Sequence, residues 1–267
     1  MSNAFFEIPI PINEPVKEFR DGSIEKKELL NTIQEMKKNQ VDIPMIINGK
    51  EVKTSKKIEI RAPHNHKLKL GTFNEGDESH VKMAIDAALK AKKEWGSMSW
   101  QSRASIFLKA AELIAGPYRS KINGSTMLGQ SKNVFQAEID AACEFIDFLN
   151  FNASYMEEIY KNQPESSDGM WNRLDYRPLE GFVFAISPFN FTSIAGNLCA
   201  SPALMGNTVV WKPAYPQIYS ANIIMEVFKK AGLPDGVINI IYVDGPVAGD
   251  IIFKHKEFAG LHFTGST

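Results

Sequence analysis

Cysteine is scarce in this chain, because only Cys143 and Cys199 occur among its 267 residues. Two cysteines exclude a fold stapled by several disulfides and favour a reducing compartment. Basic residues are not in excess either: 30 Lys and Arg face 31 Asp and Glu, which excludes a protein built mainly to bind nucleic acid. No apolar run approaches the roughly 18 residues that span a bilayer, so we expect no membrane partner.

Targeting signals and common ligand motifs are also missing. The N-terminus has neither the basic and apolar segments of a secretory signal nor the Arg-rich pattern of a mitochondrial presequence, so we expect a cytoplasmic protein. No Gly-x-Gly-x-x-Gly, Walker A, Cys-x-x-Cys or His-Glu-x-x-His motif is present. His64 and His66 form only a His-x-His pair in a polar loop, so we predict no metal site. Cys143 in a helical pattern and Cys199 among small apolar residues are typical of buried hydrophobes rather than nucleophiles.

The first 170 residues have the spacing of a mostly helical region with short strands. Apolar residues recur at helical intervals in four segments, and two short β-branched or apolar runs lie between the first two. The predicted helices start at Ser23 and span Asp77–Trp95, Ser102–Ala115 and Val134–Tyr160, and the predicted strands are Met45–Ile47 and Ile58–Ile60.

Residues 171–267 have a different pattern, in which short apolar strands alternate with helices. This alternation predicts parallel βαβ units, and the continuous apolar strands predict a sheet covered on both faces. The predicted strands are Gly181–Ser187, Thr208–Lys212, Val237–Val243 and Gly260–Phe263, and the predicted helices are Ser193–Met205, Tyr219–Ala231 and Val247–Lys254. Since the last residues end a strand and open a loop where a helix is due, we expect this α/β domain to be incomplete and the chain to be a piece of a longer protein.

Polar residues follow three of the predicted strands, at the ends where open α/β sheets bind ligands. They are Asn190, Lys212 and the pair Gly265–Ser266. Such donors suit an anion or a developing oxyanion, and a helix N-terminus after Gly265 would suit a phosphate. Asn and Lys also occupy loops for turn formation or solvation, so on these residues alone a ligand site and a merely structural role both stay open.

Three ordered motifs resemble the aldehyde dehydrogenase superfamily: Ile186–Phe191, Gly206–Pro213 and Phe263–Ser266. The resemblance implies a helical N-terminal region packed with a modified Rossmann-type, parallel-sheet NAD-binding domain, with a catalytic domain to follow. It would also account for the missing glycine fingerprint. Four further segments resemble one member, which oxidises glutamate γ-semialdehyde (1-pyrroline-5-carboxylate) to glutamate. These segments are Asn13–Val16, Gly129–Lys132, Gln136–Ala142 and Gly232–Pro234.

The family's reaction implies roles for particular residues. A Cys thiolate attacks the aldehyde, hydride passes to NAD, and a Glu-activated water releases the acid. By its motif, Asn190 would donate to the tetrahedral oxyanion. The resemblance further implies that the adenosine ribose of NAD contacts Ser187 and Lys212, that its pyrophosphate contacts Gly265, Ser266 and Thr267, and that the substrate's amino group contacts Glu138. Without the resemblance, Glu138 is typical of a solvated carboxylate on a long helix.

The nucleophilic Cys and the catalytic Glu are expected after Thr267, so we expect residues 1–267 alone to be inactive and the full-length enzyme to form a homo-oligomer. The alternative is a natural short protein, a non-catalytic nucleotide-binding or interaction module derived from an aldehyde dehydrogenase. The reading frame after Thr267 discriminates the two: continuation into a Cys motif supports the enzyme, and a stop codon supports the module.

Overall fold

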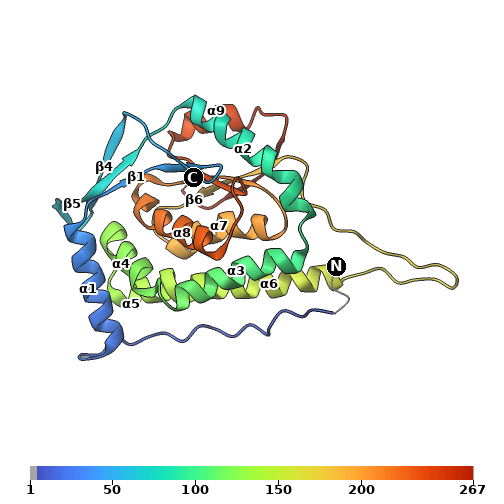
Figure 1. The fold of residues 1–267 in the computed structure, drawn as a ribbon, viewed down its shortest axis with the longest axis horizontal. Helices are drawn as coiled ribbons and strands as arrows, with labels where there is room; N and C mark the ends of the chain where they lie inside the picture. Colours follow the sequence, from blue (N-terminus) through green and yellow to red (C-terminus); the bar gives the residue numbers. More distant parts are fainter. Residues whose placement is uncertain (1–4, 267) are drawn as a thin grey trace.

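A computed structural model, which describes residues 5–266, contains two sheets and a layer of helices (Figure 1). The larger sheet has the strand order β3-β2-β8-β7-β6-β9, and the smaller sheet has the order β1-β5-β4. The larger sheet comprises β2 (Met45–Ile47), β3 (Lys50–Val52), β6 (Phe182–Ser187), β7 (Val209–Pro213), β8 (Ile238–Ile240) and β9 (Phe258–Phe263), and the smaller comprises β1 (Val41–Ile43), β4 (Lys57–Ala62) and β5 (Asn65–Asn74).

The parallel core confirms the predicted βαβ units. β8, β7, β6 and β9 pair in parallel, and helices α7 (Thr192–Leu204), α8 (Ile218–Ala231) and α9 (Gly245–Ile252) connect them. In Figure 1, α2 (Glu78–Ser97) and α9 lie above the sheet and α7 and α8 lie below it, so both faces are covered as predicted. The strands β6, β7 and β8 are accordingly buried at almost every position.

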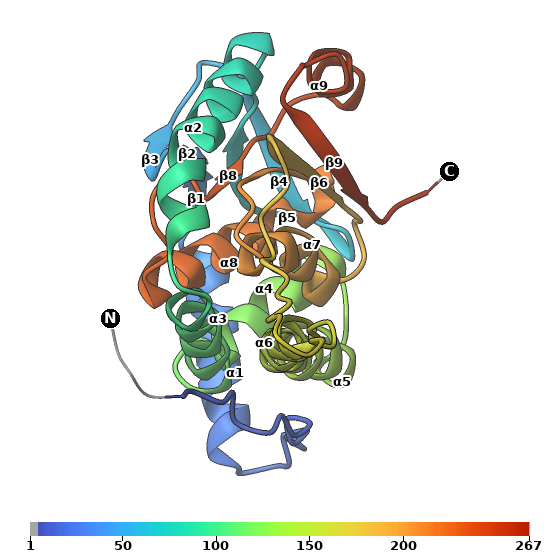
Figure 2. The same cartoon turned by 90° about the vertical axis from the view of Figure 1, so that its right-hand side faces the viewer.

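A second helical layer packs beneath α7 and α8. It consists of α3 (Trp100–Ala115), α4 (Arg119–Gln130), α5 (Val134–Ala137), a π-helix η1 (Glu138–Glu144) and α6 (Phe145–Lys161), and α1 (Ile24–Lys38) packs against α4 at one end of it. The β2–β3 hairpin lies far from this layer and instead extends the main sheet, where Ile46 pairs with Ile240 (Figure 2). The sheet therefore crosses the predicted boundary at residue 170, and that domain division stays a prediction.

Two expectations about local structure need correction, and one helix was missed. The predicted helix Val134–Tyr160 is interrupted by the π-helix η1, whose wider turn cannot be told from an α-helix by apolar spacing. The His-x-His pair was expected in a polar loop, but only His64 lies in a turn; His66 lies in β5, a ten-residue strand whose first three residues are exposed and hide its pattern. Helix α4 was not predicted, because glycine and small polar residues fill it.

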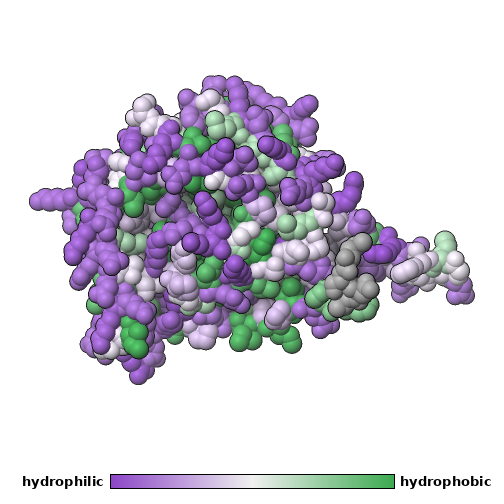
Figure 3. Space-filling model, in the orientation of Figure 1, coloured by the Kyte–Doolittle hydropathy of each residue, from purple (hydrophilic) through white to green (hydrophobic). Residues whose placement is uncertain are grey.

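Two segments without helix or strand extend along or beyond these layers. We call residues 5–22 the N-terminal strap; it runs in an extended course beneath α3 and α6 toward α1 (Figure 1). Residues 162–180 form an arm that projects away from the layers. The lower part of the surface, where the strap and the helical layer lie, mixes hydrophilic residues with apolar patches (Figure 3). Within residues 5–266, no helix combines the length and apolar character needed to cross a membrane.

Candidate functional site

The predicted polar residues lie at one edge of the main sheet. Parallel pairing aligns Ile186 with both Lys212 and Phe263, so the carboxyl ends of β6, β7 and β9 lie side by side. The edge continues past the strands, because the amide of Thr264 donates to the carbonyl of Ile186 at 3.2 Å. Backbone pairing thus brings Ser187, Lys212 and the Gly265–Ser266 turn to one place; the predicted Thr267 lies outside the described residues.

Asn190 lies in the loop that joins β6 to α7. Its side chain is exposed, and within residues 5–266 its amide makes no hydrogen bond. The loop itself is nevertheless held, since the Lys132 ammonium lies 3.9 Å from the centre of the Phe191 ring. Among the described residues, Asn190 therefore presents an amide donor without a partner, from an anchored loop at the sheet edge.

The N-terminus of α7 is capped by a carboxylate from another element. Asp140 of the π-helix accepts hydrogen bonds from the amides of Thr192 at 3.1 Å and Ser193 at 3.0 Å, and from the Ser193 hydroxyl at 2.8 Å. Lys132 donates to the same carboxylate at 2.7 Å. A carboxylate on the first amides of a helix satisfies unpaired donors and complements the helix dipole. Asp140 therefore fixes the helix start that directly follows Asn190.

A second network holds the same helix start by its hydroxyl. The Thr192 Oγ1 lies 2.8 Å from Thr126 Oγ1, and the Gln130 amide donates to it at 2.7 Å. Gln217 and Ser220, at the start of α8, contact the same oxygen, each at 3.2 Å. Because this network is buried, its loss would leave unpaired polar groups, which are costly in the interior.

Lys212 is half-buried at the end of β7. Burial lowers the pKa of its ammonium, an effect that the carboxylate of Asp244 partly offsets. Within residues 5–266 its ammonium has no ion-pair or hydrogen-bond partner, and its neighbour is the Tyr215 ring at 5.6 Å. A desolvated donor without an acceptor is suited to a polar ligand. Ser187 is 2% exposed, and its hydroxyl accepts from the Trp211 indole at 2.9 Å, so only its own hydrogen is left to donate.

Comparison with known proteins decides the family. Residues 51–267 match the aldehyde dehydrogenase family. The chain belongs to this family. A probable delta-1-pyrroline-5-carboxylate dehydrogenase of Schizosaccharomyces pombe is 48% identical over 266 residues, which are 99% of this chain and 48% of that protein. The mitochondrial delta-1-pyrroline-5-carboxylate dehydrogenase of Homo sapiens is 45% identical over 254 residues, which are 95% of this chain and 45% of that protein.

A solved structure gives the same result in three dimensions. The delta-pyrroline-5-carboxylate dehydrogenase of Mycobacterium tuberculosis, bound with NAD, superposes with a TM-score of 0.98 at 46% identity. The match covers 100% of this chain and 50% of that one, so the chain spans about half the length of the relatives it matches. The predicted superfamily resemblance and fold class are both confirmed.

Glu138 was interpreted from its helical position as a solvated carboxylate. That interpretation is wrong, because the side chain is buried. It is 0% exposed and ion-paired with Arg119. Its oxygens also accept from the Asn123 amide at 2.7 Å and from the backbone amide of Lys17 at 2.9 Å. The spacing of apolar residues could not predict the burial of Glu138, because its partners Arg119 and Lys17 come from other segments of the chain. The predicted contact with a substrate amino group stays a prediction.

The two cysteines are buried, as predicted. Burial and the charge of Glu138 raise the pKa of the Cys143 thiol to about 12. Complete burial likewise raises the pKa of the Cys199 thiol well above its ordinary value. A nucleophile needs an accessible thiolate, which neither side chain provides near neutral pH.

The structure adds Asp140 and Glu144 to the predicted site residues. Glu144 is half-buried, and its carboxylate accepts from the Ser193 hydroxyl at 2.8 Å. Burial raises the pKa of Glu144, and the nearby Asp140 charge adds to the increase. The sequence does contain a signal for these two residues. Glu138, Asp140 and Glu144 lie in one segment whose other residues are apolar, which indicates carboxylates that face the interior.

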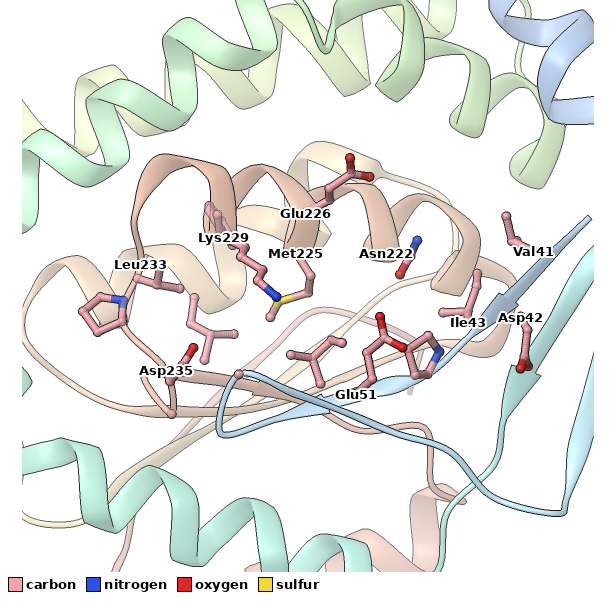
Figure 4. A pocket seen from close by; sticks show the side chains of 17 residues that line it. Val41, Asp42, Ile43, Glu51, Asn222, Met225, Glu226, Lys229, Leu233 and Asp235 are labelled. Atoms are coloured by element: carbon pink, nitrogen blue, oxygen red, sulfur yellow. The ribbon is translucent and has the colours of Figure 1, made fainter. Parts of the chain in front are cut away.

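A cavity of about 450 Å³ lies elsewhere, between α8 and the β2–β3 hairpin (Figure 4). Ile46 and Met225 contribute apolar surface to it, and Glu51 and Lys229 contribute charge. None of the predicted site residues within 5–266 lines this cavity. It is therefore separate from the edge formed by β6, β7 and β9.

Proposed function

We propose that the protein containing this chain is an NAD-dependent dehydrogenase that oxidises L-glutamate γ-semialdehyde, the open form of 1-pyrroline-5-carboxylate, to glutamate. The relatives in Schizosaccharomyces pombe, Homo sapiens and Mycobacterium tuberculosis support this by their names and by identities of 45–48% over nearly the whole chain. The observation that carries the proposal is the free Asn190 amide on an anchored loop at the sheet edge.

Asn190 supplies the electrostatic part of the chemistry. When a nucleophile adds to an aldehyde, negative charge develops on the carbonyl oxygen, and a fixed amide donor stabilises that charge more than it stabilises the ground state. The Asp140 cap and the Thr192 network keep the donor in place, so little reorganisation is needed during reaction. A single preorganised donor of this kind is typically worth about 2.7–4 kcal/mol.

Lys212 and its neighbours at the edge would hold NAD, which when bound supplies a hydride acceptor. The unpaired, desolvated Lys212 ammonium fits a hydrogen bond to a ribose hydroxyl. Ser187 would donate its remaining hydrogen on the same side. Gly265 and Ser266, with Thr267 beyond the described residues, would place backbone amides near the pyrophosphate.

The substrate's amino group needs a carboxylate. Glu138 was predicted for this contact, but its oxygens already accept from Arg119, Asn123 and Lys17. Glu144 is half-buried, lies beside the start of α7 and has one bond from Ser193. We therefore propose Glu144 as the better acceptor for a substrate ammonium and Glu138 as its structural support.

Formation of NADH from NAD and glutamate semialdehyde tests the proposal in the complete protein. We expect turnover there, and none from residues 1–267 alone, because Cys143 and Cys199 are buried and protonated. Turnover by the short chain that Cys199→Ala abolishes would contradict our interpretation of that cysteine. A complete protein that binds NAD but oxidises no aldehyde would favour a nucleotide-binding module instead.

Assembly and location belong to the same proposal. We expect a homo-oligomer of the complete enzyme, which light scattering would test. We also keep the cytoplasm as the expected compartment, although relatives in Dictyostelium discoideum and Homo sapiens are named mitochondrial. Cell fractionation with an antibody to the protein would decide between the two compartments.

A further inference from the structure

The N-terminal strap is held by carboxylates of a single helical segment. The backbone amide of Ile8 donates to Glu157 at 2.8 Å, and that of Lys17 donates to Glu138 at 2.9 Å. Between these points, Asp147 accepts from the backbone amide of Glu14 and from the side chain of Asn13, each at 2.7 Å. All three carboxylates lie on the continuous run η1–α6, so the strap is bonded along the whole length of that run.

Arg119 joins the strap to this run through the interior. The guanidinium is 3% exposed and is paired with Glu138 and with Glu14 of the strap. It also donates to the carbonyl of Pro15 at 2.9 Å. A buried guanidinium between two carboxylates is stable only with all its partners present, because each removed partner leaves an uncompensated charge. The strap therefore packs as a fixed part of the structure against α4 and η1.

The π-helix η1 connects this buried pair to the Asn190 loop. Glu138 begins η1 and faces Arg119, whereas Asp140, two residues later, caps α7. A π-helix is rare and poorly favoured by itself, so outside contacts must hold it. If η1 relaxed to an α-helix, the register after Glu138 would change, and Asp140 would leave the amides of Thr192 and Ser193.

We propose that the strap, through Glu14 and Arg119, holds η1 in its π-helical register and thereby positions the Asn190 loop. Glu14 and Arg119 are then positioning residues for the reaction, since within residues 5–266 no hydrogen bond or ion pair joins the strap to the residues at the sheet edge. The kinetic consequence rests on the proposed function, whereas the structural consequence, protection of the Thr192 and Ser193 amides, does not.

Glu14→Ala in the complete enzyme tests this, with Glu18→Ala as its matched control. Both carboxylates lie on the strap, but the Glu18 side chain is 61% exposed, and among the described residues its ion pair is with the nearby Arg20. In Glu14→Ala we expect kcat to fall about tenfold while the Kd of NAD changes less than about twofold, since misplacement of a catalytic group by a fraction of an ångström has costs of this order. Amide hydrogen exchange at Thr192 and Ser193 should become faster. Glu14→Gln, which keeps an acceptor for Arg119, should recover part of both losses.

Equal kcat and equal exchange in Glu14→Ala and Glu18→Ala would overturn the proposal. If the wild-type protein oxidises no aldehyde, the proposed function fails, and the exchange experiment alone decides the positioning role. If Glu14→Ala melts too early to assay, Glu14→Gln replaces it, because that change keeps the size of the side chain and removes only its charge from the Arg119 pair. Glu14→Gln should then give a weaker form of the same pattern, and normal kcat with normal exchange in it would contradict the proposal.

Discussion

The parallel sheet and the helical layer meet at the Asn190 loop, and different kinds of contact stabilise the two parts. On the sheet side, main-chain pairing of β6 with β7 and β9 aligns Ser187, Lys212 and the turn at Gly265. On the helical side, buried side chains carry the contacts, among them Arg119 with Glu138 and Asp140 with the start of α7. Main-chain pairing between strands persists when side chains are replaced, whereas a buried ion pair is lost when either partner is replaced. Substitutions should therefore affect stability more on the helical side and ligand binding more on the sheet side.

The largest effect is expected for Arg119→Met, which leaves the buried charge of Glu138 uncompensated and removes the ion-pair partner of the half-buried Glu14. The free energy of unfolding should fall by about 3–5 kcal/mol. Lys121→Met on the same helix is the control, because its pair with Glu226 is 38% exposed on both sides and should cost less than about 1 kcal/mol. Urea unfolding of both variants measures the difference, and equal losses would contradict the distinction between the two sides.

Asn190→Ala should affect catalysis and leave stability almost unchanged, since the amide is exposed and makes no hydrogen bond within residues 5–266. We expect kcat to fall by roughly 10²–10³ with the Kd of NAD nearly constant. Steady-state kinetics and NAD titration provide the two numbers. A near-normal kcat would remove Asn190 from the oxyanion site.

Lys212→Ala should act on cofactor binding alone. Loss of a charge-assisted hydrogen bond predicts NAD binding that is weaker by about 1–3 kcal/mol. Calorimetric titration of NAD into both proteins checks this, with melting temperatures compared to exclude misfolding. Equal dissociation constants in two folded proteins would mean that Lys212 is only a half-buried strand end.

The smallest effect concerns Glu144 and pH. Its pKa is raised in the folded state by burial, so the folded protein favours the protonated form. Stability should therefore decline as pH rises from the ordinary carboxyl pKa through the raised one, because ionisation is harder in the folded state than in the unfolded state. Glu144→Gln should reduce this slope, measured as melting temperature against pH. An unchanged slope would show that the side chain is better solvated than its burial indicates.

Sequence patterns located the sheet side well for a physical reason. Strands β6, β7 and β9 are short apolar runs bounded by Gly, Pro or polar residues, and those signals are local. The edge residues Ser187, Lys212 and Gly265 followed from the ends of these strands. The β2–β3 hairpin was predicted only in part, and its attachment to β8 depends on a long-range pair, Ile46 with Ile240.

Most helices of the helical side were predicted, but its side-chain contacts could not be, because they join residues far apart in the chain. Gly129 lowers the helix propensity of α4, yet a Cβ there would lie 3.3 Å from the Tyr219 Cβ, so the glycine serves close packing against α8. The burial of Glu138 depends on Arg119, and the role of Asp140 depends on Thr192 and Ser193. A 3.6-residue period carries no information on these partners.

The central claim is that both sides work as one unit through the Asn190 loop, and a double-mutant cycle on kcat tests it most directly. Asp140→Asn weakens the cap on α7, Asn190→Ala removes the donor, and the third protein carries both changes. If Asp140 acts by positioning Asn190, the double variant should lose no more than Asn190→Ala alone, roughly 10²–10³ in kcat. Losses that multiply in the double variant would show that Asp140 acts independently and would contradict the account.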